Sequence, residues 1–258
     1  MLTNPTMEHL KEMRLSGMVE AYGRQLEFPD NAALTFEERF SLIIDYEWSR
    51  RRTNQLNRLI KHAGFPQEAL LEDIFKTEKR KYNKSIFQTL CTTDWIEQGL
   101  NVVVTGPTGV GKSYFAIAFG YMACRRNQQV RYYRTSALMD ELSASKTDGS
   151  YRKLLRQLQK CDLLILDDWG LNPFNTSETR AILDLIDERN LRRSMVIVSQ
   201  IPLDTWGQVL SDDTFADAIM DRVIKNSYQF ELDGSSFRGA EARKRMEAAK
   251  VIDESAIQ

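Results

Sequence analysis

The sequence predicts an α/β fold, in which a doubly wound parallel sheet follows a small all-helical region. After residue 100, short runs that are apolar throughout alternate with longer runs whose apolar residues have helical spacing. Strands without a polar face are typical of a parallel sheet that helices cover on both sides. Before residue 65, by contrast, the apolar pattern is helical only.

Five runs are expected to form the sheet. The clearest are residues 101–105, with the sequence NVVVT, and residues 195–199, with the sequence MVIVS. Both are rich in β-branched residues, which favour strands. The predicted strands are residues 101–105, 129–134, 162–167, 195–199 and 228–232.

Helices are expected before, between and after these strands. Their apolar residues recur three or four positions apart, which places them on one helical face. The predicted helices are residues 67–75, 94–98, 112–126, 137–145, 150–160, 176–191, 214–225 and 238–249.

The first 64 residues are predicted to form a separate helical domain. A long helix is expected to begin after Thr35, because a hydroxyl side chain followed by acidic residues is a helix start signal. Its apolar pattern continues to about His62, and Gly64 and Pro66 then interrupt it. The sequence thus predicts a helical domain at residues 1–64 and an α/β domain at residues 65–258.

The composition excludes some classes of function. The net charge of the 258 residues is −1, so binding to nucleic acid would have to rest on local clusters of charge. Three scattered cysteines and two histidines indicate neither a disulfide framework nor a zinc site. We see no signal peptide and no apolar run near the roughly 20 residues that span a bilayer, and we expect a cytoplasmic protein.

One motif after the first predicted strand carries the strongest functional signal. The sequence GPTGVGKS matches G-x-x-x-x-G-K-[ST], with a strand before it and a helix after it. Such a loop surrounds phosphates with backbone N–H groups, while its lysine reaches the β- and γ-phosphates and its serine can bind Mg²⁺. We therefore predict an ATP and Mg²⁺ site. Its predicted cofactor-binding residues are Gly106, Pro107, Thr108, Gly109, Val110, Gly111, Lys112, Ser113 and Tyr114.

Polar residues at the ends of two later strands are predicted to complete the ATP site. The run LLILDD ends in Asp167, expected to hold the Mg²⁺ shell, and Asp168, expected to polarise the attacking water. Ser199 and Gln200 end the next strand, where a polar side chain could contact the γ-phosphate or orient the water. We name Ser199 as the candidate catalytic residue there, beside Lys112 and Asp168.

With these elements in order, the chain resembles the AAA+ ATPases of the initiator and helicase-loader clade. It is most similar to the IstB family, the ATP-binding helpers of IS21-type transposons. The resemblance covers nearly the whole length. The motifs that carry it are NVVVT leading into GPTGVGKS, LLILDDWG at 163–170, SQIP at 199–202, DAIMDRV at 217–223 and GSSFRG at 234–239.

The resemblance implies further roles for single residues. Arg222 occupies the place of an arginine finger, which completes the ATP site of a neighbouring subunit, and Arg238 that of a second sensor arginine for the γ-phosphate. It therefore implies a homo-oligomer with ATP at its subunit interfaces. Asp168 is one methylene shorter than the glutamate of most AAA+ enzymes, so slow turnover without a stimulating partner is expected. Only about 26 residues follow the last predicted strand, which implies a reduced C-terminal lid.

Clusters of basic residues on this nearly neutral chain are candidates for contacts with DNA phosphates. One spans residues 50–61 without an acid, a second residues 76–84, and a third residues 146–160. Nothing resembles a base-reading motif, so we expect binding to double-stranded DNA that tolerates any sequence. The candidate DNA-binding residues are Arg50, Arg51, Arg52, Arg58, Lys61, Lys146 and Arg152.

The leading hypothesis is an ATPase that assembles on target DNA, remodels it, and recruits and stimulates a transposase. The main alternative is a DnaC-like loader of a replicative helicase, which would have the same ATP site. A small-molecule kinase is disfavoured by the paired acids and by the long segment that precedes the P-loop. A binding module with an inactive ATP site is disfavoured because Lys112, Ser113, Asp167 and Asp168 are all present.

Overall fold

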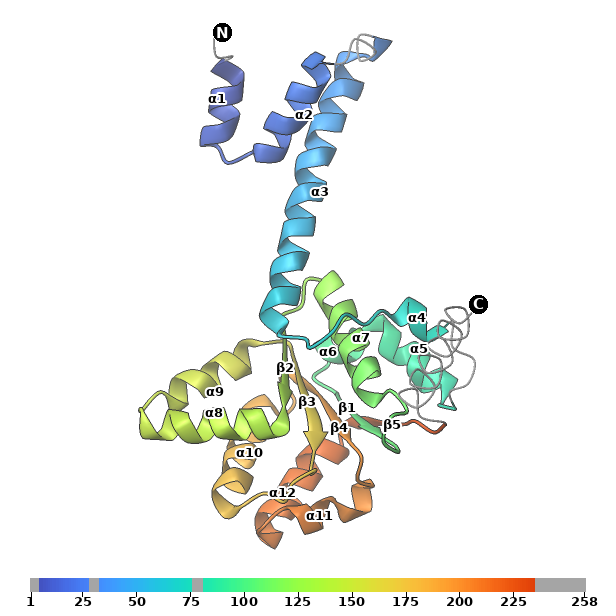
Figure 1. Ribbon diagram of the computed structural model, residues 1–258, viewed down its shortest axis with the longest axis vertical. Helices are drawn as coiled ribbons and strands as arrows, with labels where there is room; N and C mark the ends of the chain where they lie inside the picture. The colour runs from blue at the N-terminus through green and yellow to red at the C-terminus, as the bar shows by residue number, and fades with distance from the viewer. Residues whose placement is uncertain (1–4, 28–32, 76–80, 235–258) are drawn as a thin grey trace, which may run out of the picture. The chain divides into compact units, whose positions relative to one another are not determined.

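The computed structural model describes residues 5–27, 33–75 and 81–234 (Figure 1). The chain divides into two compact units, one from Met1 to Arg58 and one from Leu59 onward. Within the described residues, no helix is both long enough and apolar enough to cross a membrane. The domain boundary predicted after residue 64 falls one residue beyond the end of a helix and stays a prediction.

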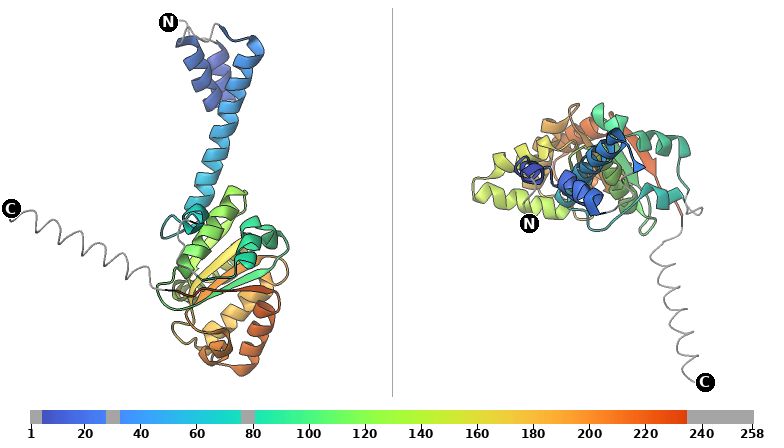
Figure 2. Two further views of the ribbon diagram at one scale, coloured as in Figure 1. Left: turned by 90° about the vertical axis from the view of Figure 1, so that its right-hand side faces the viewer. Right: turned by 90° about the horizontal axis from the view of Figure 1, so that it is seen from above.

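The first unit consists of helices: α1 (Pro5–Glu12), α2 (Ser16–Glu27) and the larger part of α3 (Phe36–Ala63) (Figure 2). A left-handed residue, Arg14 with φ of 58°, separates α1 from α2. The predicted start of the long helix is confirmed in detail. The Thr35 hydroxyl accepts a hydrogen bond from the Glu38 N–H, and the Glu38 carboxylate accepts one from the Thr35 N–H, which forms a reciprocal cap.

A buried carboxylate joins α2 to α3. Oε2 of Glu47, in α3, accepts hydrogen bonds from the backbone N–H groups of Gly17, at 2.6 Å, and Met18, at 3.1 Å. Its other oxygen accepts from Arg51 at 2.5 Å. The helices approach so closely here that a Cβ at Gly17 would lie 2.9 Å from the Glu47 Cα. Glu47 thus satisfies N–H groups in the first turn of α2, which that helix itself leaves without partners.

The second unit contains the predicted five-stranded parallel sheet, in the order β2-β3-β4-β1-β5. All four neighbouring pairs run parallel. The central strands are buried on both faces, as their apolar sequences predict. The strands are β1 (Asn101–Thr105), β2 (Val130–Arg134), β3 (Leu163–Trp169), β4 (Ser194–Ser199) and β5 (Ser227–Glu231).

Helices cover both faces of this sheet, which makes the fold doubly wound as predicted (Figure 1). The helices of the second unit are α4 (Leu71–Phe75), α5 (Lys84–Thr92), α6 (Asp94–Glu97), α7 (Lys112–Arg125), α8 (Thr135–Thr147), α9 (Tyr151–Lys160), α10 (Thr176–Arg189), the short η2 (Leu203–Thr205), α11 (Trp206–Val209) and α12 (Asp213–Ile224). Helices α8, α9, α10 and α12 share one hydrophobic core with β1, β3 and β4. Helix α7 packs on the opposite face, where a Cβ at Gly120 would lie 2.9 Å from the Ile165 side chain of β3.

Several elements differ from the sequence prediction or lie outside the described residues. The short helices η2 and α11, after β4, were not predicted. Strand β3 does not end at the two acids but continues to Trp169. Helix α5 was not predicted, although Asn83 caps it with hydrogen bonds from the N–H groups of Ser85 and Ile86. The predicted helix at residues 238–249 and the reduced lid lie outside the described residues.

Candidate active site

The P-loop connects β1 to α7, and glycines determine its path. Gly106, Gly109 and Gly111 have φ values of 142°, 84° and 97°, a region that other residues rarely adopt. A Cβ at Gly106 would also collide with the carbonyl oxygen of Leu232, whose N–H donates to Thr105 at 2.9 Å. The loop therefore lies flat against the chain that follows β5 and presents the N-terminus of α7, a favourable position for a phosphate.

The Lys112 ammonium lies against the loop itself. Its Nζ donates hydrogen bonds to the carbonyl oxygens of Gly106, at 2.7 Å, and Pro107, at 2.8 Å, and the residue is 6% exposed. The charge is thus held within a few ångströms of the backbone N–H groups that would surround a phosphate. Ser113 follows it in the first turn of α7. The Tyr114 hydroxyl accepts from the N–H of Leu70, just before α4, at 3.3 Å, and donates to Asp73 of α4 at 3.4 Å.

The two predicted acids of β3 lie in different environments. Asp167 is 3% exposed, and Asp168 is partly exposed with a left-handed φ of 58°. Between Leu166 and Trp169 the pairing of β3 with β4 shifts register, so Asp168 is the extra residue of a β-bulge. Trp169 thereby joins the same hydrophobic core as Leu166, although an unbroken strand would place them on opposite faces. The bulge sets the direction of the Asp168 side chain independently of Asp167.

A contact that the sequence did not predict involves Tyr132 of β2. Its hydroxyl donates to Oδ2 of Asp167 at 2.7 Å. Burial, and next the hydrogen bond to Asp167, raise the pKa of Tyr132 above its usual value, so the hydroxyl stays protonated and remains a donor.

Ser199 and Gln200, at the end of β4, differ in burial and in hydrogen-bond partners. The Ser199 side chain is fully buried, donates to the carbonyl of Trp169 at 2.9 Å, and accepts from the N–H of Ile201 at 3.0 Å. Gln200 is exposed, and its Oε1 accepts a hydrogen bond from the Thr108 hydroxyl at 2.5 Å. The polar group in contact with the P-loop is therefore Gln200, while Ser199 bonds to backbone. A catalytic role for Ser199 stays a prediction, and the geometry favours Gln200 for it.

A hollow of about 660 Å³ lies beside the P-loop, at the carboxyl ends of the strands. This edge is where parallel α/β sheets bind ligands. The hollow is lined by residues of β1, the P-loop, the segment after β4, and β5, among them Gly106, Gln200, Asp204 and Glu231.

Arg222, on α12, is engaged within its own chain. It forms an ion pair with Asp187 of α10 and donates to the carbonyl of Ala218 at 3.0 Å. Its side chain remains 33% exposed, so it stays accessible to solvent. Arg238, the second arginine that the resemblance implies, lies outside the described residues.

The candidate DNA-binding residues of the first unit are not equivalent. Arg50 pairs with Glu20 at 2.8 Å, and Arg51 pairs with Glu47. Arg52 lies over the ring of Trp48, at 5.1 Å from its centroid. Arg58 is exposed, and so is Lys61 at the end of α3 in the second unit. Arg50 and Arg51 are thus committed to contacts within the unit, which leaves less of their charge for a phosphate.

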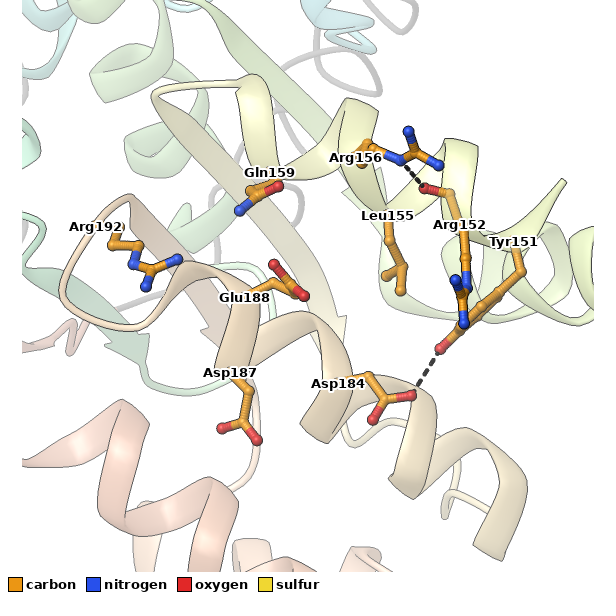
Figure 3. Close-up of a pocket in the computed structure, with 9 residues that line it drawn as sticks. All are labelled: Tyr151, Arg152, Leu155, Arg156, Gln159, Asp184, Asp187, Glu188 and Arg192. Carbon is orange, nitrogen blue, oxygen red and sulfur yellow. Dashed lines mark hydrogen bonds between the residues drawn. The ribbon is translucent and has the colours of Figure 1, made fainter.

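In the second unit, candidate basic residues flank a charged groove of about 1020 Å³ between α9 and α10 (Figure 3). Arg152 and Arg156 of α9 line one side of it, and the acidic residues Asp184, Asp187 and Glu188 of α10 line the other. Arg156 donates to the Arg152 carbonyl on its own helix, and Asp187 pairs with Arg222. The carboxylates of α10 offset part of the positive charge of these arginines within the groove.

Lys146 lies at the end of α8. It donates to the Ser177 hydroxyl at 3.1 Å and lies over the Tyr151 ring, 5.3 Å from its centroid. The structure therefore places Lys146 and Arg152 near each other in the second unit without making the region uniformly positive.

Comparisons with known proteins identify the family of the chain. The profile of the family described as IstB-like ATP binding protein matches residues 8–246. The protein y4pL of Sinorhizobium fredii, named as an insertion sequence ATP-binding protein, is 36% identical over 244 residues, 95% of this chain and 100% of that protein. A protein of Pseudomonas fluorescens, named as an ATP-binding protein of insertion sequence IS1162, is 40% identical over 80% of this chain and 89% of that protein.

Solved structures support the fold. The crystal structure of DnaI superposes with a TM-score of 0.56 at 19% identity, over 69% of this chain and 94% of that one. The profile match and the two relatives cover most of the chain, which confirms the resemblance seen in its motifs. The chain therefore belongs to the IstB-like ATP binding proteins and is an ATPase with the AAA+ P-loop fold.

Proposed function

We propose that this ATPase assembles on target double-stranded DNA as an ATP-bound oligomer, remodels the DNA, and recruits and stimulates a transposase. One observation carries the proposal. A P-loop and two adjacent carboxylates near the carboxyl end of β3 occur together in a chain whose relatives, over nearly its whole length, are named as insertion sequence proteins. The chain would supply the energy and the DNA geometry, and the transposase would supply the chemistry on DNA.

At the ATP site, backbone N–H groups of the P-loop and the Lys112 ammonium would bind the phosphates. The Ser113 hydroxyl and the Asp167 carboxylate are oxygen donors, the ligand type that Mg²⁺ prefers. Asp167 suits a cation further because it is buried and has no ion pair with any residue in the described part of the chain. The bound Mg²⁺ would neutralise charge that develops on the phosphates.

Two groups are candidates to handle the attacking water. Asp168 is turned out of the strand by the β-bulge and could accept its proton. Gln200 contacts the P-loop through Thr108 and could orient the water by hydrogen bonding. Both side chains come from carboxyl ends of adjacent strands, so they lie on the same edge of the sheet as the P-loop.

Arg222 supports the proposal that the active form is an oligomer. A guanidinium that reaches a γ-phosphate stabilises the transition state of phosphoryl transfer. In the single chain Arg222 pairs with Asp187, and its partial exposure leaves it available to a neighbouring subunit. We propose that on assembly the Arg222 guanidinium leaves the Asp187 carboxylate and contacts the ATP bound by that neighbour.

The proposed DNA contacts would be made to phosphates, without base reading. In the first unit, Arg52 and Arg58 are better candidates than Arg50 and Arg51, because the latter pair are bound to carboxylates. In the second unit, Lys61, Lys146 and Arg152 remain candidates. Contacts of this kind make affinity fall steeply with salt.

The alternative, a helicase loader, would have the same ATP site, so the ATP site does not separate the two functions. The discriminating experiment measures the ATPase rate and the ATP-dependent oligomeric mass with and without random-sequence duplex DNA. If duplex DNA raises turnover or drives assembly, the transposition function is supported. If it changes neither, that function is rejected in favour of a loader whose trigger is a protein.

Variants make this experiment specific. Lys112→Ala should abolish DNA-dependent hydrolysis, and normal turnover would reject the P-loop assignment. Arg222→Ala should retain ATP binding but lower turnover by roughly a thousandfold or more if it acts in trans. Lys225→Ala is its control, because this neighbouring cation, just after α12, is 73% exposed and pairs with Asp221 in the preceding turn. Equal rates for the Arg222 and Lys225 variants would rule out the trans role.

A further inference from the structure

The Asp167 carboxylate is oriented at both of its oxygens. Oδ1 accepts the backbone N–H of Asp168 at 2.9 Å, and Oδ2 accepts the Tyr132 hydroxyl at 2.7 Å. Its main-chain carbonyl accepts the Thr135 hydroxyl at 2.8 Å. Since a carboxylate oxygen has two acceptor positions, each oxygen keeps one for a further ligand. Asp168 N–H belongs to the same strand, so Tyr132 is the side chain that fixes the carboxylate from outside it.

The sheet register explains this contact. Tyr132 of β2 pairs with Ile165 of β3, two residues before Asp167, and therefore lies on the same face of the sheet as that acid. Side chains of a strand lean along its direction, and the long tyrosine ring spans the two-residue offset. β2 is an edge strand next to β3, so no other strand separates the phenol from the carboxylate.

An aromatic cluster holds the Tyr132 ring in place. Phe65 meets it nearly edge-on, with ring centroids 6.5 Å apart and planes at 63°. Phe65 is in turn stacked on Tyr121 of α7, with centroids 4.9 Å apart. Space for Phe65 exists only because residue 120 is glycine, where a Cβ would lie 2.7 Å from the Phe65 ring. The position of the hydroxyl thus depends on packing that does not involve the hydroxyl itself.

We propose that Tyr132 is a positioning residue of the nucleotide site, whose hydroxyl fixes the Asp167 carboxylate in the orientation that receives Mg²⁺. This inference rests on the proposed ATP and Mg²⁺ site. Tyr132 would not touch the metal or the nucleotide. It would act as the hydrogen-bonded partner of a metal-binding carboxylate, and such partners strongly affect metal affinity.

The test compares Tyr132→Phe with the wild-type chain. Phenylalanine keeps the ring and its packing against Phe65 and removes only the hydroxyl. Binding of the fluorescent, non-hydrolysable nucleotide methylanthraniloyl-AMPPNP would be followed while Mg²⁺ is titrated, with a second series in EDTA. We expect unchanged binding in EDTA and an increase of about 10-fold in the Mg²⁺ concentration that gives half-maximal effect.

The neighbouring tyrosine provides a matched control. Tyr133 lies in the same strand, but it packs on the opposite face against the core shared by α8, α9 and α10. Tyr133→Phe should leave the Mg²⁺ titration unchanged. An unchanged titration in Tyr132→Phe, or equal shifts in both variants, would overturn the inference. If the wild-type chain itself shows no Mg²⁺-dependent binding, the proposed site fails first.

A double variant tests whether Tyr132 acts through Asp167. In an Asp167→Asn background, adding Tyr132→Phe should have no further effect on the Mg²⁺ titration, because the oriented carboxylate is already absent. Independent, multiplicative losses would show that Tyr132 acts elsewhere and would overturn the inference. Thermal unfolding of each variant checks that it is folded at the temperature of the Mg²⁺ titration, so that a shift cannot be due to unfolding.

Discussion

The helical unit and the sheet unit stabilise themselves in opposite ways. In the sheet unit, the three central strands and the inner faces of the helices are almost fully buried. Among the described residues of the helical unit, only Gly17, Ala21, Ile43 and Glu47 are buried. Seven of its large apolar side chains are exposed: Met13, Leu26, Phe36, Phe40, Leu42, Ile44 and Trp48.

This difference in buried apolar area suits the two units to different roles. Burial of apolar area provides most of the stability of a domain, and the sheet unit can therefore hold strained residues such as Asp168 in place. The helical unit relies on local contacts, chiefly the Glu47 carboxylate at the start of α2. A surface of exposed apolar side chains of this kind often marks an interaction site.

The largest expected effect is that of a truncation in the sheet core. Leu164 is completely buried, so Leu164→Ala should lower the free energy of unfolding of the sheet unit by about 2–5 kcal/mol. Urea unfolding followed by tryptophan fluorescence measures this, because Trp95, Trp169 and Trp206 are all buried in that unit. A change below about 1 kcal/mol would mean that the site collapses around the smaller side chain.

An intermediate effect is expected for Glu47→Gln in the helical unit. The amide keeps the size of the side chain but loses the charge that strengthens its hydrogen bonds to Gly17 and Met18, at a cost of about 1–2 kcal/mol. Hydrogen exchange at those two amides measures the loss, since the faster exchange reports local opening. Exchange in the sheet unit is the internal control and should stay the same.

The same contact makes the helical unit sensitive to acid. Burial disfavours the charged form of Glu47, but the hydrogen bonds from Arg51, Gly17 and Met18 outweigh this and lower its pKa. The contribution to stability is fully present above the usual glutamate pKa of about 4.3 and is lost as pH falls through the lower folded value. In Glu47→Gln this part of the pH dependence should disappear from exchange measured at the Gly17 and Met18 amides.

The smallest expected effect is that of Leu42→Ala, which makes the same chemical change as Leu164→Ala. Leu42 is 52% exposed on α3, and alanine is at least as good a helix former, so stability should change by less than about 0.5 kcal/mol. Hydrogen exchange of α3 measures it. A loss that grows with protein concentration would indicate that the exposed apolar face is covered in an assembled form.

Local patterns were enough to predict the sheet, most of its helices and the position of the P-loop between β1 and α7. The apolar strands, the P-loop and the cap at Thr35 depend on residues close in sequence, and each was predicted from such residues. Helix α5 was missed although Asn83, its cap, is a signal of the same local kind. The β-bulge was not predictable, because the pattern of LLILDD does not reveal that Trp169 returns to the face of Leu166.

Contacts across the sheet account for the rest of what the sequence did not show. The bond between Tyr132 and Asp167 joins residues 35 positions apart, and that between Thr108 and Gln200 joins residues 92 positions apart. Ser199 and Gln200 are adjacent and both polar, so only the turn after β4 decides which one faces the P-loop. In the same way, the pairing of Arg50 with Glu20 could not be foreseen from a cluster of basic residues.

The close contact between Gly106 and Leu232 has a consequence for anyone who shortens this protein. The backbone after β5 packs directly against the P-loop. In that segment, Asp233 forms two backbone hydrogen bonds with Lys81, of 3.1 and 3.0 Å. A fragment designed to carry the ATP site therefore has to begin before Lys81 and extend through Asp233. A shorter fragment would lose the backbone that supports the P-loop, even if it kept every residue of the loop itself.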